Sequence, residues 1–303
     1  MSGGRIRGMG AATVAAALAA AVGAAGCLEA KEEMALNADG SGRVTVRAAM
    51  LPLPREGAEP AAYTPDDARR LAQRMVAGSK GVEAWKDVAY GVAESGAMRF
   101  EGTAYFRDVS ALAIQSVPSF AIRLERRPGG DLVLELAAGG EGAEPRGEAA
   151  EGAKGTEAVA KSVERIRADY AQWRAAQGPW FEPLRLDLSI QLPGRVADAG
   201  TLERVGETGV RLSVAGRDLL AAMDAMVADG AHLERVATAG EDVFGGPTGR
   251  AELRRRLFGS VRPVRVRMTG EAGAVFDYAA ESSAAKAGSG ALRERLGLAK
   301  PGE

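Results

Sequence analysis

The chain has 303 residues, of which 46% are hydrophobic and 26% are charged. Its 39 basic and 40 acidic residues nearly cancel, which excludes the strongly basic surface that nucleic-acid-binding proteins carry. Cys27 is the only cysteine, so an internal disulfide is excluded and a hydrophobic core has to stabilise the fold.

The first 26 residues have the layout of a secretory signal. Arg5 and Arg7 make the start cationic, and residues 11–23 are small or apolar. This apolar run is shorter than the roughly 20 residues that a membrane-spanning helix needs. The chain becomes charged directly after Cys27. We therefore predict a cleaved signal peptide over residues 1–26.

The signal ends in Ala24-Ala25-Gly26-Cys27, which resembles the lipobox of bacterial lipoproteins. The resemblance implies cleavage between Gly26 and Cys27 and attachment of acyl chains such as palmitate at Cys27. Leucine is usual where Ala24 stands, and an ordinary signal cleavage that leaves a free thiol is the alternative. Leu28 follows the cysteine, which favours the outer membrane if the sorting rule of enteric bacteria applies. The cell membrane stays open as the other location.

Residues 27–136 are predicted to form an N-terminal α+β half with three β-hairpins. Alternation of apolar and polar residues predicts these hairpins over residues 29–50, 81–106 and 120–136. A helix is predicted over residues 64–77, because a threonine is followed there by a proline and two acids.

Residues 137–156 are rich in Gly, Ala and Glu, and are predicted to be a flexible linker or insertion. Residues 157–297 are predicted to form a C-terminal α+β half, and residues 298–303 a frayed tail. The half is predicted to contain helices over 157–177, 217–228 and 248–258, strands over 184–190, 210–214 and 264–268, and a last helix from 275. Gly178-Pro179 is predicted to end the first of these helices.

The fold class expected from this order is α+β, with antiparallel hairpins packed with helices in a two-layer sandwich. An Asp39–Gly42 turn soon after a lipobox, and a strand that ends in Leu192–Val196, together resemble LppM-type bacterial lipoprotein domains. The resemblance implies an α+β sandwich, with lipid or glycolipid binding as a hypothesis.

The sequence gives little evidence for a metal site or for a catalytic histidine. Asn37, Asp39 and Ser41 have the spacing of the first calcium ligands of a loop, but Ala48 stands where the last acidic ligand is needed. His232 is the only histidine and is predicted to lie on the surface, at a helix end or in a loop. We expect no cofactor, no metal and no nucleic-acid partner.

Three other groups of residues have structural and functional interpretations. The adjacent carboxylates Asp66-Asp67 and Glu32-Glu33 are candidates for glycoside hydrolysis, but a helix cap and an exposed strand explain them more simply. Arg254-Arg255-Arg256 is predicted to be a solvated helix surface, with a phosphate or headgroup contact as the alternative. The tryptophans are predicted to be core or groove residues: Trp85, Trp173 and Trp180.

We therefore predict a non-enzymatic lipoprotein of the bacterial envelope, anchored at Cys27 and facing the periplasm or the cell exterior. Its body is expected to bind a lipid or other apolar ligand, or a partner protein. A carboxylate-based envelope hydrolase and a purely structural envelope component are the alternatives. Residues expected to line a core or a pocket are Trp85, Met98, Phe100, Phe106 and Ile122.

Overall fold

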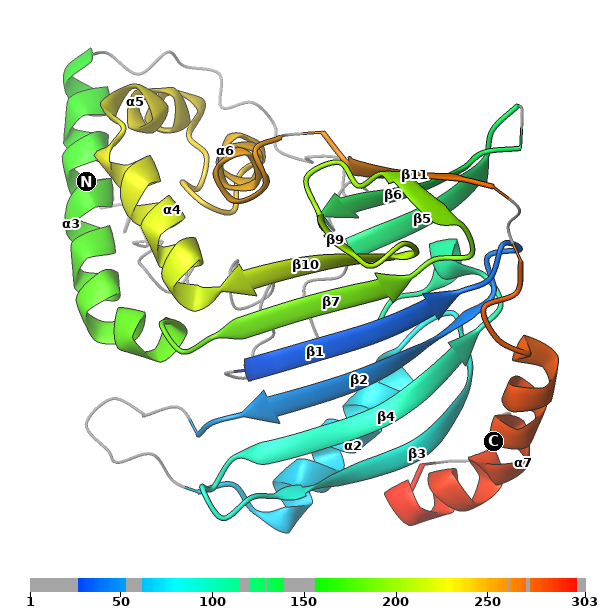
Figure 1. The fold of residues 1–303 in the computed structure, drawn as a ribbon. Helices are drawn as coiled ribbons and strands as arrows, with labels where there is room; N and C mark the ends of the chain where they lie inside the picture. Colours follow the sequence, from blue (N-terminus) through cyan, green and yellow to red (C-terminus); the bar gives the residue numbers. More distant parts are fainter. Residues whose placement is uncertain are drawn as a thin grey trace, which may run out of the picture.

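The structure, a computed structural model, describes residues 27–52, 62–114, 120–128, 130–138, 156–260, 262–270 and 273–298. The predicted signal peptide and nearly all of the predicted linker and tail lie outside these residues. The described residues form two β-sheets and six α-helices (Figure 1). The predicted α+β fold class is confirmed.

The larger sheet has seven strands in the order β3-β4-β2-β1-β7-β10-β9. Their bounds are β1 Cys27–Leu36, β2 Gly42–Met50, β3 Val82–Val92, β4 Met98–Phe106, β7 Arg185–Gln191, β9 Glu203–Val205 and β10 Gly209–Ala215. The smaller sheet has four strands in the order β5-β6-β11-β8. Their bounds are β5 Phe120–Arg126, β6 Leu132–Ala138, β8 Arg195–Asp198 and β11 Val264–Thr269.

All three predicted hairpins are present as antiparallel pairs: β1–β2, β3–β4 and β5–β6. In the first hairpin, Gly40 has a φ of +86°, which is the left-handed conformation that the Asp-Gly sequence predicts. Local sequence therefore specifies the hairpins, because alternation and turn chemistry both act over a few residues.

The pairing between hairpins was not visible in the sequence. β1 pairs with β7 in parallel, and this pair joins the two predicted halves into one sheet. The smaller sheet also combines strands of both halves. Two short strands, β8 and β9, and one helix, α5, were not predicted. Parallel pairing over such a sequence distance leaves no local signature.

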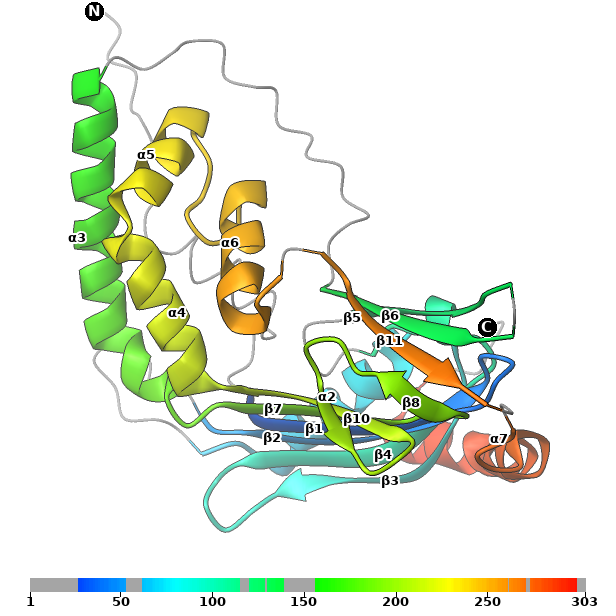
Figure 2. The ribbon, with the colours of Figure 1, turned by 45° about the horizontal axis from the view of Figure 1, so that its top comes forward.

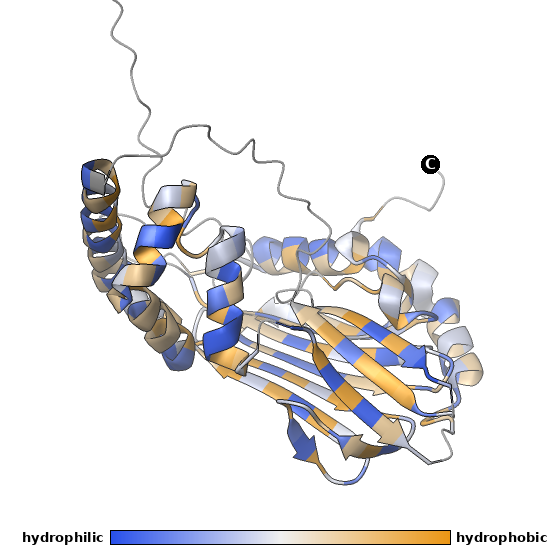
Figure 3. Ribbon diagram, turned by 90° about the horizontal axis from the view of Figure 1, so that it is seen from above, coloured by the Kyte–Doolittle hydropathy of each residue, from blue (hydrophilic) through white to orange (hydrophobic). Residues whose placement is uncertain are grey.

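The main hydrophobic core lies between the two sheets. One face of the larger sheet packs against α2 (Pro65–Gly78) and against the smaller sheet. The residues predicted to line a core or pocket are all buried in this core: Trp85, Met98, Phe100, Phe106 and Ile122. They are therefore core residues. Figure 3 shows the alternation of apolar with polar residues along the strands.

A separate helical lobe stands beside the sheets (Figure 2). It consists of α3 Thr156–Phe181, α4 Gly216–Ala228, α5 Gly230–Ala239 and α6 Pro247–Phe258. These helices share a second hydrophobic core. The predicted end of the first helix at Gly178-Pro179 was wrong, because α3 continues to Phe181 with Pro179 in its last turn. A proline there removes one hydrogen bond only, close to where the helix ends anyway.

The last helix, α7 (Tyr278–Leu296), lies against the face of β3 and β4 that points away from the main core (Figure 1). We call this the outer face of the larger sheet. None of the helices in the described ranges is both long enough and apolar enough to cross a bilayer.

Candidate functional site

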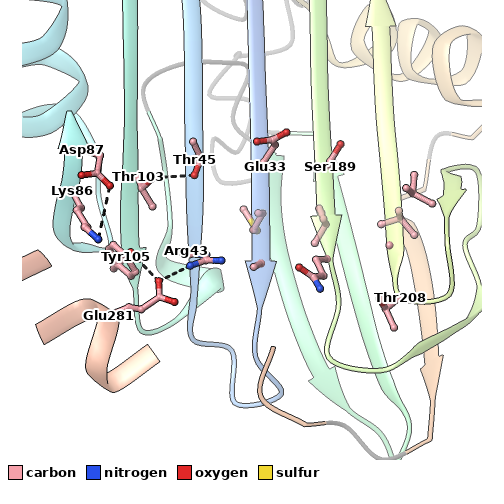
Figure 4. Close-up of a pocket in the computed structure, with 17 residues that line it drawn as sticks. Glu33, Arg43, Thr45, Lys86, Asp87, Thr103, Tyr105, Ser189, Thr208 and Glu281 are labelled. Carbon is pink, nitrogen blue, oxygen red and sulfur yellow. Dashed lines mark hydrogen bonds and ion pairs between the residues drawn. The ribbon is translucent and has the colours of Figure 1, made fainter. Parts of the chain in front are cut away.

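A polar groove of about 740 Å³ lies across the outer face of the larger sheet (Figure 4). β1, β2, β4, β7 and β10 form its floor, while α7 and β9 border it on opposite sides. It is open to solvent, and the side chains that line it are mostly polar or charged. We call it the outer groove and treat it as the candidate site.

The strand register explains why the outer groove is hollow. Glu33 of β1 lies opposite Thr45 of β2 and opposite Ser189 of β7, and Thr45 in turn lies opposite Thr103 of β4. The hydroxyl oxygens of Thr45 and Thr103 are 2.9 Å apart and share a hydrogen bond. Thr45, Thr103 and Ser189 have short side chains, so the floor on both sides of Glu33 is low and lined by hydroxyl groups.

The wall at α7 is held by a cluster of polar and aromatic groups. Glu281 of α7 accepts hydrogen bonds from the Arg43 guanidinium at 2.5 Å and from the Tyr105 hydroxyl at 3.0 Å. The Arg43 guanidinium also lies over the Phe276 ring, 4.7 Å from its centre. α7 is thus fixed to β2 and β4, and its carboxylate faces the groove.

An irregularity in β3 places two charged side chains on the rim. The register between β3 and β4 shifts between Lys86 and Ala89, which marks a β-bulge. Asp87, inside this bulge, is the one non-glycine residue with a positive φ, 53°, in the part of the chain that the structure describes. Bulges and strained backbone are common next to binding sites, because they redirect side chains. Lys86 and Asp87 both line the outer groove.

Two ionisable groups that line the outer groove have shifted pKa values, Glu33 and Tyr105. The Lys31 ammonium, which hydrogen-bonds to Glu33, lowers the pKa of Glu33. Burial, with the Glu281 carboxylate beside it, raises the pKa of Tyr105. Glu33 therefore stays ionised and presents a fixed hydrogen-bond acceptor to a ligand. Tyr105 stays protonated, but it is buried against α7 and donates its hydroxyl to Glu281.

A second hollow is apolar and much smaller. It lies where α6 meets the two sheets, and it is lined by side chains that include Leu136, Leu212 and Phe258. Its volume is about 20 Å³, which is enough for about one water molecule. It is far below the roughly 300–1,000 Å³ of typical ligand pockets.

Cys27 and Gly26, predicted to flank the signal cleavage, lie at the edge of the described chain. β1 begins at Cys27, which pairs with Met50 of β2, and Gly26 lies outside the described residues. Lipid attachment at Cys27 remains a prediction.

The residues weighed for calcium close the first turn instead. The Asn37 side-chain oxygen accepts a hydrogen bond from the Val275 N–H at 2.7 Å, and its amide donates to the Ser41 hydroxyl at 3.2 Å. The Asp39 carboxylate accepts from the Ser41 N–H at 3.0 Å. These bonds connect the β1–β2 turn to the segment before α7. Within the described ranges, no group of three or more His, Cys, Asp or Glu side chains could hold a metal ion.

The prediction that His232 lies on the surface was wrong. It is fully buried in α5, and neither ring nitrogen has a hydrogen-bond partner. The prediction failed because α5 was not foreseen: Asp229 caps this helix by accepting from the His232 N–H at 3.0 Å. His232 lies in the helical lobe and outside the outer groove.

The adjacent carboxylates do not form catalytic pairs. Asp66 and Asp67 lie in the first turn of α2, where Asp67 belongs to a capping box with Thr64. Glu32 and Glu33 point to opposite faces of β1, as neighbours in a strand do. Only Glu33 lines the outer groove.

The arginine triplet of α6 is solvated only in part. Arg255 is exposed, but the Arg256 side chain is 23% exposed and pairs with Glu252 at 2.6 Å and with Asp229 at 3.4 Å. The prediction of a solvated surface therefore holds for Arg255 and was wrong for Arg256, because α4 packs against α6 and its C-cap, Asp229, lies beside Arg256.

Sequence reasoning missed the outer groove. The alternation that predicted the hairpins leaves Thr45 and Thr103 on the side opposite the buried apolar residues beside them. It could not place Ser189 beside Glu33, because that contact depends on the parallel β1–β7 pair. Short polar side chains at outward positions of several strands were the available signal.

No protein-family model matches the chain, and no curated protein does either. Among solved structures, the chain is similar to the folded domain of the LppM protein from Mycobacterium tuberculosis, with a TM-score of 0.27 and 12% sequence identity. The match covers 62% of this chain and 81% of that domain. This is the type of lipoprotein domain that the sequence resembles. A TM-score this low is too weak to establish a shared fold or function.

Proposed function

We propose that this chain is a non-enzymatic lipoprotein of the bacterial envelope, anchored by acyl chains at Cys27. Its folded body faces the periplasm or the cell exterior and binds a partner protein through the outer groove. The change from apolar to charged sequence at Cys27 supports the anchor.

One observation favours a partner protein over an apolar ligand: the difference between the two hollows. The outer groove is polar, open and about 740 Å³, whereas the apolar hollow is about 20 Å³. An acyl chain needs a dry pocket of several hundred Å³. A peptide segment instead needs hydrogen-bonding side chains, which Glu33, Thr45 and Ser189 provide, and an arginine such as Arg43, since arginine is enriched in protein interfaces.

The chemistry of the outer groove supports binding rather than hydrolysis. A glycosidase needs one carboxyl group that stays protonated near neutral pH, which requires a raised pKa. In the outer groove the pKa of Glu33 is lowered, and Glu281 is occupied by Arg43 and Tyr105. The groove therefore offers fixed charges and hydroxyl groups, which suit recognition.

The anchor is tested by mass spectrometry of the mature amino terminus. We expect the chain to begin at Cys27 and to carry the added mass of acyl chains. A Cys27→Ser variant should lose both the modification and the membrane association. A native chain that keeps Met1, or that carries an unmodified Cys27, would contradict the anchor.

The outer groove is tested by photo-crosslinking in cells. A photoreactive amino acid is placed at Gln191, which is exposed and lines the groove, or at Arg265, which is exposed on the smaller sheet. We expect a discrete protein adduct at position 191, and its loss when Ser189→Trp fills the groove floor. Equal adducts at both positions, or adducts that persist in the Ser189→Trp variant, would contradict binding in the groove.

A further inference from the structure

The chain leaves almost no linker between Cys27 and the folded body. β1 begins at Cys27 and is a central strand of the larger sheet, with β2 on one side and β7 on the other. Ala30, three residues later, is buried. At about 3.3 Å per residue, this segment reaches about 10 Å. An anchor at Cys27 would therefore hold one end of the larger sheet at the bilayer surface.

The outer face carries two arginines at that end of the sheet. Strand pairing aligns Arg99 of β4, Ala49 of β2, Glu29 of β1 and Arg185 of β7 in a single row. This is the last outward-facing row before Cys27, and we call it the terminal row. Arg99 and Arg185 are both exposed. Arg185 donates hydrogen bonds to the carbonyl oxygens of Leu184 at 2.8 Å and Glu182 at 3.4 Å.

Farther from Cys27 on the same face, the arginines form ion pairs with carboxylates. Arg47 pairs with Glu33 and Glu101, Arg211 pairs with Asp187, and Arg43 pairs with Glu281.

Within the described residues, neither Arg99 nor Arg185 forms an ion pair with a carboxylate. The terminal row also contains the exposed carboxylate of Glu29, opposite Arg185, so its two arginines and one glutamate give a net charge of +1 at the Cys27 end of this face.

A partly exposed tryptophan precedes the terminal row in the sequence. Trp180 is in the last turn of α3, and residues 181–184 connect it to Arg185, the first residue of β7. Tryptophan is enriched at the level of lipid headgroups, where its ring is half apolar and its N–H is polar. Arginine binds phosphate oxygens with a fork of N–H donors.

We propose that the Cys27 end of the larger sheet rests on the anionic phospholipid headgroups of the membrane that holds the anchor. Arg99 and Arg185 contact the lipid phosphates, and Trp180 lies at the same level. This inference rests on the proposed lipid attachment at Cys27. It also sets the height of the outer groove: residues 33–35 of β1 lie six to eight residues from Cys27, so the groove is held about 20–26 Å from the anchor.

The test uses the acylated full protein in vesicles of phosphatidylcholine with phosphatidylglycerol. Because Cys27 is the only cysteine, a single introduced cysteine can carry a fluorophore once the Cys27 thiol is acylated. Ser95→Cys puts the label in the β3–β4 turn at the Cys27 end, and Ser283→Cys puts it on the exposed side of α7. Quenching by headgroup-labelled lipid then reports contact with the membrane surface.

We expect stronger quenching at position 95 than at position 283. The double variant Arg99→Gln/Arg185→Gln should weaken headgroup contact by about fivefold for each arginine lost. Arg265→Gln/Arg267→Gln, which removes the same charge from the exposed side of β11, should leave the quenching unchanged. A Gly-Ser linker inserted after Leu28 should make positions 95 and 283 equivalent.

Two results would overturn the inference while mass spectrometry still finds acylated Cys27. One is equal quenching at positions 95 and 283 in the native sequence. The other is energy transfer between the fluorophores at position 95 of two copies, without quenching by headgroup-labelled lipid. That result would mean that this end of the sheet packs against a second chain. An unmodified Cys27 would instead overturn the proposed anchor, so the two failures are distinguishable.

Discussion

The main core between the sheets and the core of the helical lobe both contain a buried polar atom without a partner, but they differ in whether that atom titrates. In the main core it is the indole nitrogen of Trp85, which does not titrate. In the sheets, the buried side chains of Asn37 and Ser41 hydrogen-bond to each other and to nearby groups. In the lobe, His232 is fully buried and both ring nitrogens lack a partner. A buried polar group without a partner costs about 1–3 kcal/mol. The lobe is therefore expected to be the less stable region at low pH.

The two surfaces proposed to bind a partner and the membrane both lie on the larger sheet. The outer groove and the terminal row are both built on the larger sheet, whose strands fix their side chains in register. The lobe joins this sheet through α3 and α4, and Gly216 allows a close approach there, since a Cβ atom would clash with the Phe181 carbonyl oxygen. We infer that the sheet provides the rigid binding surface.

The largest expected effect is the loss of a ring from the main core. Phe100 is 2% exposed and packs edge-on against Trp85, with ring centres 5.7 Å apart. We expect Phe100→Ala to lower the free energy of unfolding by about 3–5 kcal/mol, because it leaves a cavity. Chemical denaturation followed by circular dichroism measures this. Val205→Ala, at a residue 49% exposed, is the control and should change stability by less than about 0.5 kcal/mol. A similar small loss for Phe100→Ala would mean that this core is not rigidly packed.

The elements of the main core were the predictable part of the fold. β1–β2, β3–β4 and β5–β6 are specified by alternation and by turns such as Asp39-Gly40, which act within a few residues. The parallel contact between Glu33 and Ser189 depends on tertiary packing, and so does the docking of the lobe. Pairing across about 150 residues cannot be deduced from one sequence, because many strand orders satisfy the same alternation.

The second prediction concerns the pH dependence of the lobe. Burial lowers the pKa of His232 and Arg235 reinforces this effect, while Glu252, the nearby backbone of Val243 and Asp229 oppose it. The unfolded chain therefore binds a proton at a higher pH than the folded chain. Stability is expected to be complete above the ordinary histidine pKa of about 6.5, and to fall as the pH drops below it. Denaturation midpoints between about pH 7.5 and pH 5.5 measure this slope.

His232→Leu is the matched variant for that prediction. Leucine fills a similar volume and has no ionisable group, so the slope in this pH range should largely disappear. His232 is the only histidine, and carboxyl groups ordinarily titrate near pH 4, below the range tested. An equal slope in the variant would show that the unpartnered imidazole does not set the pH response of the lobe.

His232 and the outer groove also show why the sites were harder to predict than the fold class. A histidine in Asp229-Gly230-Ala231-His232 has the sequence of a loop, yet the aspartate caps a new helix there and the lobe covers the ring. The outer groove, in turn, is assembled from single residues on five strands. Neither site has a contiguous motif, so composition and spacing could not indicate either one.

The smallest expected effect on stability is the loss of an exposed ion pair on the outer face of the larger sheet. Arg47 donates hydrogen bonds to Glu33 at 2.8 Å and to Glu101 at 2.7 Å, but its side chain is 45% exposed. Water and salt screen such pairs, so Arg47→Gln should lower the free energy of unfolding by at most about 0.5 kcal/mol, and by less at high salt. Denaturation at low and high ionic strength measures both values. A loss as large as that of Phe100→Ala would mean that the ion pairs of the outer face stabilise the sheet. The outer face would then be a structural element, and its polar side chains would need no ligand to explain them.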